Sequence, residues 1–277
     1  MVKTPLGQKI SGRGVESEKV LKILVIGDVT SPSGVEHLSR VLWKFREKHR
    51  IDLCVVNGEN ASFITGISEE LAEKLLRAGA DCITGGNHTL HNTRAHTMLE
   101  ESDAVLRPIN YGHSVPGRGY TLLDAAGYRM LVINAMGNVH IEPVLDSPYP
   151  YIDRLLAQME GKYDFSILDI HAEATGEKLA LGRAYDGRIN VIFGTHTHVP
   201  TADEQVLPKG TGYITDVGMC GESGGVLGMD AECVITRMRT KIPHKFKASS
   251  GAVVADGVIF ELDTSKGAVT GVTRVKI

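Results

Sequence analysis

The amino-acid sequence predicts an α/β fold. Three observations support this prediction: short apolar runs that end in glycine or a polar residue, helical patterns between several of these runs, and strand-like segments after Gly212. Such runs, rich in Val, Ile and Leu and with little alternation, are typical of strands buried on both faces of a sheet. Strands that alternate with helices in this order indicate an α/β domain.

The predicted strands of the first two thirds of the chain share this composition. They lie at residues 22–26, 51–56, 81–84, 130–133, 165–170 and 190–193. Three helices are predicted between them, at 35–45, 68–78 and 151–160. The second has the clearest ends, because Ser68 is a favourable N-cap, acidic residues follow it, and Gly79 comes just after the last turn.

The pattern changes after Gly212. Strand-like segments occupy residues 213–217, 253–262 and 269–276, with a turn at 264–267 between the last two. We therefore expect a second sheet, built largely from antiparallel strands, that shares one core with the first. Residues 21–277 are expected to form a single domain, preceded by a flexible lead-in at residues 1–20.

Composition and charge narrow the classes of function. The chain has 277 residues, of which 42% are hydrophobic and 23% charged, as in ordinary globular proteins. Its net charge of −3 gives no basic field for binding duplex nucleic acid. No apolar stretch approaches the roughly 20 residues that span a bilayer. Four scattered cysteines without a C-x-x-C pair indicate a reducing cytoplasm rather than a disulfide framework.

Polar side chains with metal-binding chemistry follow five of the predicted strands. They are Asp28, Glu59, Asn60, Asn87, His88, His171, His196 and His198. In open α/β sheets, ligands bind at the carboxyl ends of the strands. Carboxylate, amide and imidazole groups together favour first-row divalent metal ions. Each residue taken alone is compatible with a simple turn or a surface position, and it is their conjunction that predicts a metal centre.

The number of candidate ligands predicts two metal ions rather than one. A single ion needs three or four protein ligands, whereas seven of these residues suit two ions that share a carboxylate. Paired ions about 3.5–4 Å apart serve displacement reactions at phosphorus. His88, beside Asn87, is then the expected proton donor to the leaving oxygen.

Five segments of the sequence resemble those of a known family. The segments GDV, NGENA, GGNHT, HAEATGEK and GTHTHVPTAD, in this order, resemble the calcineurin-like metallophosphoesterases, and more narrowly the YmdB-type phosphodiesterases. The resemblance implies a four-layered αββα sandwich with two mixed sheets. It also implies activity on 2′,3′- or 3′,5′-cyclic nucleotides, with iron, manganese or magnesium as the metal.

The resemblance further implies how the ligands divide. One ion would be bound by Asp28, Glu59, Asn60 and His198. The other would be bound by Glu59, Asn87, His171 and His196, with Glu59 bridging and His88 as the catalytic acid. The chain departs from the family's usual residues at Ser31, Val35, Leu90 and His91, which we expect near the mouth of the site, where they would affect substrate preference.

Three functions are compatible with this sequence. The favoured one is a cytoplasmic metal-dependent phosphodiesterase acting on a small phosphodiester. The second is a phosphomonoesterase or nucleotidase that uses the same metals. The third is a regulatory protein that binds a nucleotide or a partner with little turnover. No membrane association and no duplex nucleic acid are expected, and a homo-oligomer is compatible with the sequence.

Overall fold

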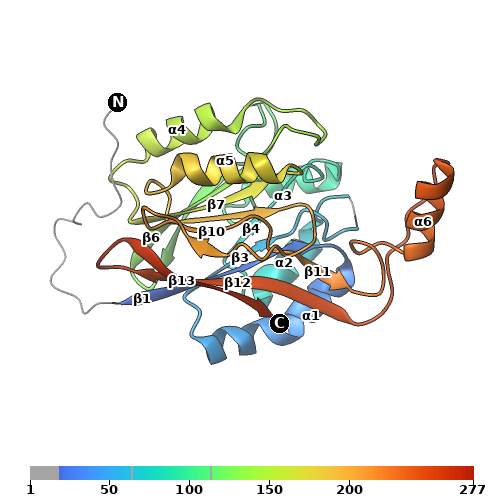
Figure 1. Cartoon of the computed structure of the whole chain (residues 1–277), viewed down its shortest axis with the longest axis horizontal. Coiled ribbons are helices and arrows are strands. Elements are labelled where there is room, and N and C mark those ends of the chain that lie inside the picture. The colour runs from blue at the N-terminus through green and yellow to red at the C-terminus, as the bar shows by residue number, and fades with distance from the viewer. Residues whose placement is uncertain (1–18, 64, 113) are drawn as a thin grey trace.

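The computed structural model describes residues 19–63, 65–112 and 114–277. Within these residues, the strands form two mixed sheets packed face to face, with helices on both outer faces (Figure 1). This is the αββα arrangement that the family resemblance implies. Residues 1–18 of the expected lead-in lie outside the described part of the chain, and Val20 already begins the first strand.

The first sheet has seven strands in the described residues, and its path runs β2-β11-β12-β1-β3-β4, with β13 paired to β12. The bounds are β1 Val20–Ile26, β2 Asp28–Val29, β3 Leu53–Asn57, β4 Cys82–Thr84, β11 Met219–Glu222, β12 Val253–Asp263 and β13 Ala268–Lys276. Strands β1, β3 and β4 are parallel, whereas β12 runs antiparallel to both β1 and β13.

The second sheet follows the order β5-β6-β7-β8-β10-β9. Its strands are β5 Tyr120–Ala125, β6 Tyr128–Met136, β7 Phe165–His171, β8 Val191–Thr195, β9 Gln205–Val206 and β10 Gly212–Ile214. Strands β6, β7, β8 and β10 are parallel, and the two edge strands are antiparallel.

The expectation that the C-terminal strands build the second sheet is wrong. Strand β12 pairs with the whole length of β1, from Val20 opposite Asp263 to Ile26 opposite Gly257, and so extends the first sheet. Strand β10 instead joins the second sheet, parallel to β8. Val258, Phe260 and Leu262 of β12 lie between the sheets. They would do so whichever sheet the strand joined, so composition alone does not distinguish the two pairings.

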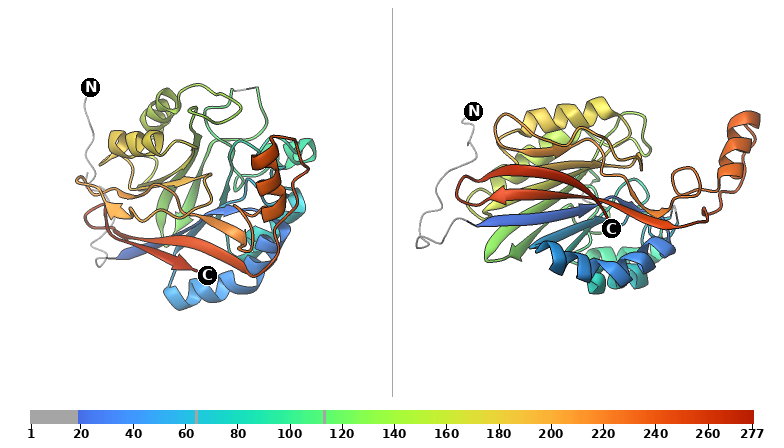
Figure 2. Two further views of the ribbon diagram at one scale, coloured as in Figure 1. Left: turned by 45° about the vertical axis from the view of Figure 1, so that its right-hand side comes forward. Right: turned by 60° about the horizontal axis from the view of Figure 1, so that its bottom comes forward.

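Helices cover the two outer faces of the sandwich in the described residues. Their bounds are α1 Pro32–His49, α2 Glu69–Ala78, η1 Thr93–Ala95, α3 His96–Glu101, α4 Pro148–Gln158, α5 Thr175–Tyr185 and α6 Ala231–Thr240. Helices α1 and α2 lie on the first sheet and α4 and α5 on the second, while α6 projects from the body (Figures 1 and 2). The three predicted helices are confirmed as α1, α2 and α4.

The ends of α2 form as the sequence predicts. Oγ of Ser68 accepts a hydrogen bond from the backbone N–H of Leu71 at 3.3 Å, and Gly79 ends the helix with φ of 112°. Helices α5 and α6 are not predicted by the sequence analysis. In α5, Gly176 and Gly182 weaken the helical signal, although Gly182 allows the ring of Tyr213 to pack closely against the backbone.

Three apolar cores hold these layers together. The central core lies between the sheets, where Ile23 and Val25 of β1 meet residues such as Phe193 of β8. The alternate residues of β1, Leu24 and Ile26, point to the opposite face and pack under α1 and α2. A third core lies between the second sheet and helices α4 and α5. The expected shared core between two sheets is therefore present. None of the helices described is long and apolar enough to span a membrane.

Candidate metal centre

The predicted site residues come from the carboxyl ends of strands in both sheets. Asp28 begins β2, directly after β1, and His171 is the last residue of β7. The others follow strands: Glu59 and Asn60 follow β3, Asn87 and His88 follow β4, and His196 and His198 follow β8. The sequence predicts a single edge, whereas the structure brings two edges together, because the sheets pack with these strand ends adjacent.

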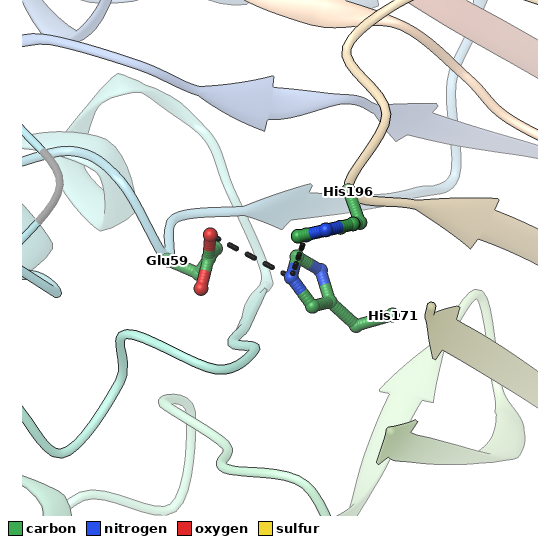
Figure 3. Close-up of side chains that lie close together, drawn as sticks. All are labelled: Glu59, His171 and His196. Carbon is green, nitrogen blue, oxygen red and sulfur yellow. Dashed lines mark hydrogen bonds and ion pairs between the residues drawn. The ribbon is translucent and has the colours of Figure 1, made fainter. Parts of the chain in front are cut away.

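Glu59, His171 and His196 form the centre of the site (Figure 3). Each offers one ligand atom, and these atoms all lie within 4.8 Å of one another. Nδ1 of His196 is 3.1 Å from Nε2 of His171, and Oε1 of Glu59 is 3.6 Å from the same Nε2. This group is one that could hold a metal ion.

Asn87 approaches the same nitrogen of His171. Its Oδ1 lies 3.0 Å from Nε2 of His171, so an amide oxygen, a carboxylate oxygen and a second imidazole surround this atom. Gly86 permits the approach, because a Cβ built on it would lie 2.3 Å from the ring of His171. The four residues that the resemblance assigns to one ion are thus mutual neighbours.

Asp28 and His198 are a second pair of neighbours in the site. Oδ1 of Asp28 is 3.7 Å from Nε2 of His198, and Oδ2 accepts a hydrogen bond from the backbone N–H of His196 at 2.9 Å. Nδ2 of Asn60 is 3.4 Å from Nε2 of His198, so the amide nitrogen of Asn60 faces the ring in this structure. The residues assigned to the other ion are therefore also neighbours.

One buried oxygen of this group lacks a partner. Oδ1 of Asp28 is completely buried and accepts no hydrogen bond from any described residue. A buried carboxylate oxygen without a hydrogen bond is costly, unless a cation compensates for it. Burial, together with the nearby carboxylates of Glu59 and Asp216, raises the pKa of Asp28 well above its ordinary value.

His88 lies at the edge of the cluster and is partly exposed. Its Nδ1 is 2.8 Å from Oδ1 of Asn60 and 3.2 Å from Oε1 of Glu59, and its backbone N–H donates to Oε2 of Glu59 at 2.8 Å. Burial opposes protonation of this ring, but the hydrogen bond with Glu59 raises the pKa of His88 above its usual value. Its other ring nitrogen, Nε2, is 3.4 Å from Nδ2 of Asn87.

The remaining histidines are held neutral by their surroundings. Burial lowers the pKa of His171 well below its ordinary value, and burial also lowers the pKa values of His196 and His198. For Glu59, burial raises the pKa, but the hydrogen bonds that its carboxylate accepts from His88 bring it below the usual carboxyl value. The site therefore combines an ionised carboxylate with neutral imidazoles, the protonation states that bind metal ions.

The backbone that carries His196 and His198 is itself unusual. Both residues have positive φ, 101° and 61°, in a region that side chains other than glycine rarely adopt. Thr197 between them is fixed by Asp216, whose Oδ2 accepts from the backbone N–H at 3.1 Å and from the hydroxyl at 2.7 Å. Sequence reasoning missed Asp216, because it lies within an apolar strand-like run.

The departures from the family's usual residues lie in different places. Ser31 caps α1 and donates a hydrogen bond to Glu222 at 2.8 Å, and Val35 is fully buried in the core under that helix, so the expectation that these two line the mouth is wrong. His91 is exposed, and its ring centroid is 5.0 Å from that of His88. With Arg94 and other residues it lines a surface cavity of about 480 Å³.

Comparison with known proteins agrees with the fold and the site. A 2′,3′-cyclic-nucleotide 2′-phosphodiesterase from Bacillus subtilis is 39% identical over 93% of this chain and 97% of that protein. A solved structure of a novel phosphatase from Mycoplasma pneumoniae is 32% identical, with a TM-score of 0.86 over 94% of both chains. A hypothetical protein from Thermus thermophilus is 36% identical, with a TM-score of 0.85 over 93% of this chain and 99% of that one.

The two packed mixed sheets, with a polar cluster at their strand ends, define the class of protein as a calcineurin-like phosphoesterase. Within this class, the profile of the YmdB-like proteins matches residues 24–275. The chain belongs to the YmdB-like protein family.

Proposed function

We propose that this chain is a metal-dependent phosphodiesterase that hydrolyses cyclic nucleotides. The observation that supports the proposal most is the close approach of Glu59, His171 and His196, whose ligand atoms lie within 4.8 Å of one another. The relative from B. subtilis, which carries the name of a cyclic-nucleotide phosphodiesterase, is similar over nearly its whole length. A small phosphodiester is thus the proposed substrate, in either the 2′,3′-cyclic or the 3′,5′-cyclic form.

The residues present fit a metal centre. The buried, unpartnered Oδ1 of Asp28 and the neutral imidazole of His171 are the kinds of group that a cation would satisfy. We propose two ions of iron, manganese or magnesium, with Glu59 contacting both. Asp28, Asn60 and His198 would complete one set of ligands, and Asn87, His171 and His196 the other.

Bound metal ions would supply Lewis acidity, which polarises a phosphoryl group and makes water a better nucleophile at neutral pH. The chain itself supplies proton transfer. Oδ1 of Asn60 accepts from Nδ1 of His88 and keeps a proton on that nitrogen; when the ring is protonated, which its raised pKa favours, Nε2 carries the second proton, and this is the one given to the departing oxygen. Asp28 and Glu59 are deeply buried, which keeps bulk water away from these carboxylates.

The compartment we propose is the cytoplasm. All four cysteines are free, and three of them, Cys54, Cys82 and Cys220, are buried in the core. A chain with free thiols and without disulfide bonds suits a reducing compartment.

The test combines metal analysis with a panel of substrates. We expect the purified protein to contain close to two metal ions per chain and to hydrolyse 2′,3′-cyclic AMP and bis-p-nitrophenyl phosphate faster than p-nitrophenyl phosphate. His88→Ala should retain its metal and lose about 10²–10⁴-fold in turnover. Preference for p-nitrophenyl phosphate would point instead to a phosphomonoesterase, and metal-loaded protein without turnover would point to a regulatory binding protein.

A further inference from the structure

Behind the candidate metal centre, one buried carboxylate joins the ends of four strands from both sheets. Asp169 lies in β7 and is fully buried. Its Oδ2 accepts hydrogen bonds from Nδ2 of Asn57 in β3, at 3.0 Å, and from the hydroxyl of Thr84 in β4. Its Oδ1 accepts from the hydroxyl of Thr195 in β8, at 2.8 Å. None of these residues belongs to the proposed ligand set.

The hydroxyl of Thr195 also contacts a proposed ligand. Nδ1 of His171 lies 3.0 Å from Oγ1 of Thr195. The other oxygen near this nitrogen, Oδ1 of Asp28, is 3.8 Å away, which is beyond hydrogen-bond distance. Thr195 is therefore the group that determines whether Nδ1 of His171 carries a proton.

The direction of this hydrogen bond follows from the donors available. A hydroxyl has one proton to donate and two lone pairs that accept. The proton of Thr195 goes to Asp169, because a carboxylate can only accept. Nδ2 of Asn57, at 3.2 Å, can only donate, so it offers Oγ1 no acceptor, and its two protons are also within reach of Asp169 and of the carbonyl of Gly85. With its own proton given to Asp169, Oγ1 can only accept from His171, and Nδ1 of His171 therefore carries the proton.

The proton on Nδ1 decides which ring nitrogen of His171 has a lone pair available to bind a metal ion. A neutral imidazole carries one proton, so a protonated Nδ1 leaves the lone pair on Nε2. Nε2 is the nitrogen that faces Oδ1 of Asn87 at 3.0 Å, Nδ1 of His196 at 3.1 Å and Oε1 of Glu59 at 3.6 Å. The free lone pair of Nε2 therefore points to the place where these donor atoms converge, an arrangement that suits a bound cation.

We propose that Asp169 and Thr195 are positioning residues, which hold His171 in the tautomer whose Nε2 can bind a metal ion. Groups of this kind orient metal-binding histidines, and their loss typically costs 10–100-fold in metal affinity. The importance of Nε2 rests on the proposed function. The tautomer, however, is a property of the metal-free chain and is tested separately.

The first test measures the tautomer of His171 by ¹⁵N NMR on metal-free protein with labelled histidine, near pH 7.5. His171→Gln assigns the signal. We expect a protonated Nδ1 in the wild type and in Thr195→Ser, and its loss in Thr195→Val. The matched control is Thr211→Val, which removes a fully buried hydroxyl that donates to the carbonyl of Ile189 near the other end of β8, and which should leave the tautomer unchanged.

A second variant makes the test independent of the stability of Thr195→Val. In Asp169→Asn, the donors from Asn57 and Thr84 favour the new amide oxygen at the position of Oδ2. The amide nitrogen would then face Thr195 and donate to it. The hydroxyl proton would turn toward His171, and the proton of the ring would move to Nε2.

The second measurement is Mn²⁺ affinity by calorimetry. Thr195→Val should bind Mn²⁺ 10–100-fold more weakly than Thr211→Val, and Thr195→Ser should recover most of this loss. A protonated Nδ1 in both Thr195→Val and Asp169→Asn, with Mn²⁺ affinity equal to that of the control, would overturn the inference. Wild-type protein that binds no Mn²⁺ would contradict the proposed function instead, and the tautomer measurement would still decide the role of Thr195.

Discussion

Nζ of Lys178 lies 2.7 Å from Oδ2 of Asp216, and both side chains are fully buried. Lys178 comes from α5, and Asp216 follows β10, so the pair joins a helix to the segment behind the site. The same carboxylate holds Thr197, which stands between His196 and His198. This ion pair therefore supports the strained backbone that presents two of the proposed ligands.

Removal of one partner of this pair should destabilise the protein strongly. Lys178→Met leaves Asp216 charged and buried without its cation, and we expect a loss of about 3–5 kcal/mol in the free energy of unfolding. Lys74→Met, which breaks an exposed pair with Glu36, is the matched control and should cost far less. Urea denaturation measures both. Equal losses in the two variants would contradict the structural role of the buried pair.

Asp28→Asn should make the metal-free protein more stable and weaken its stabilisation by metal. The buried carboxylate of Asp28 lies near those of Glu59 and Asp216, and an amide removes this repulsion while it can still accept the hydrogen bond from His196. We expect a gain of about 0.5–2 kcal/mol in chelator-treated protein. Thermal unfolding with EDTA and with Mn²⁺ measures both effects. A variant less stable than the wild type in EDTA would show that repulsion at Asp28 is unimportant.

The stability contribution of Asp203 should depend on pH. Burial raises its pKa, but hydrogen bonds from Thr201 and Thr215 outweigh burial and bring the pKa of Asp203 below its ordinary value. A lowered pKa means that the folded state favours the charged carboxylate. Its contribution is thus present above about pH 4 and is lost as the pH falls further.

Asp203→Asn should therefore cost about 1 kcal/mol at pH 7, and progressively less below pH 4. Urea denaturation of variant and wild type at a series of pH values measures this difference. A difference that grows as the pH falls would contradict the lowered pKa of Asp203.

Three of the four cysteines should be unreactive in the folded protein. Cys54, Cys82 and Cys220 are fully buried, and burial raises the pKa of each thiol far above its ordinary value, so the reactive thiolate is scarce. Cys233 in α6 is only partly buried. A maleimide reagent should modify at most one thiol per chain in the native state and all four in denaturant, as counted by mass spectrometry. Rapid native labelling of Cys54 would contradict the packing of β3.

Much of the fold follows from the sequence because local signals and burial agree. The Ser68 cap and Gly79 define α2, and the apolar runs predict β1, β3, β7 and β8 with errors of one or two residues. Which strands pair with one another depends on residues that are far apart in the sequence. The alternation along β12 places Val258 and Phe260 between the sheets whichever neighbour the strand takes, and only the long register with β1 decides its position.

The residues of the site also divide into those that the local sequence indicates and those that depend on distant partners. Glycine and polar residues directly after apolar runs drew attention to Glu59, Asn87 and His171, and these side chains are neighbours in the structure; their roles as ligands stay predictions. Asp169 and Lys178 were missed because their importance depends on partners far away in the sequence. A carboxylate within the apolar run of β7 is nevertheless a signal, since a buried charge needs partners.

Diffraction from crystals grown with Mn²⁺, collected at a wavelength where manganese scatters anomalously, tests the central claim most directly. The account predicts two anomalous peaks about 3.5–4 Å apart, with Glu59 contacting both. One peak should lie beside Asp28 and His198, and the other beside His171 and His196. An absence of peaks between these side chains, or side chains turned away from any bound ion, would contradict it.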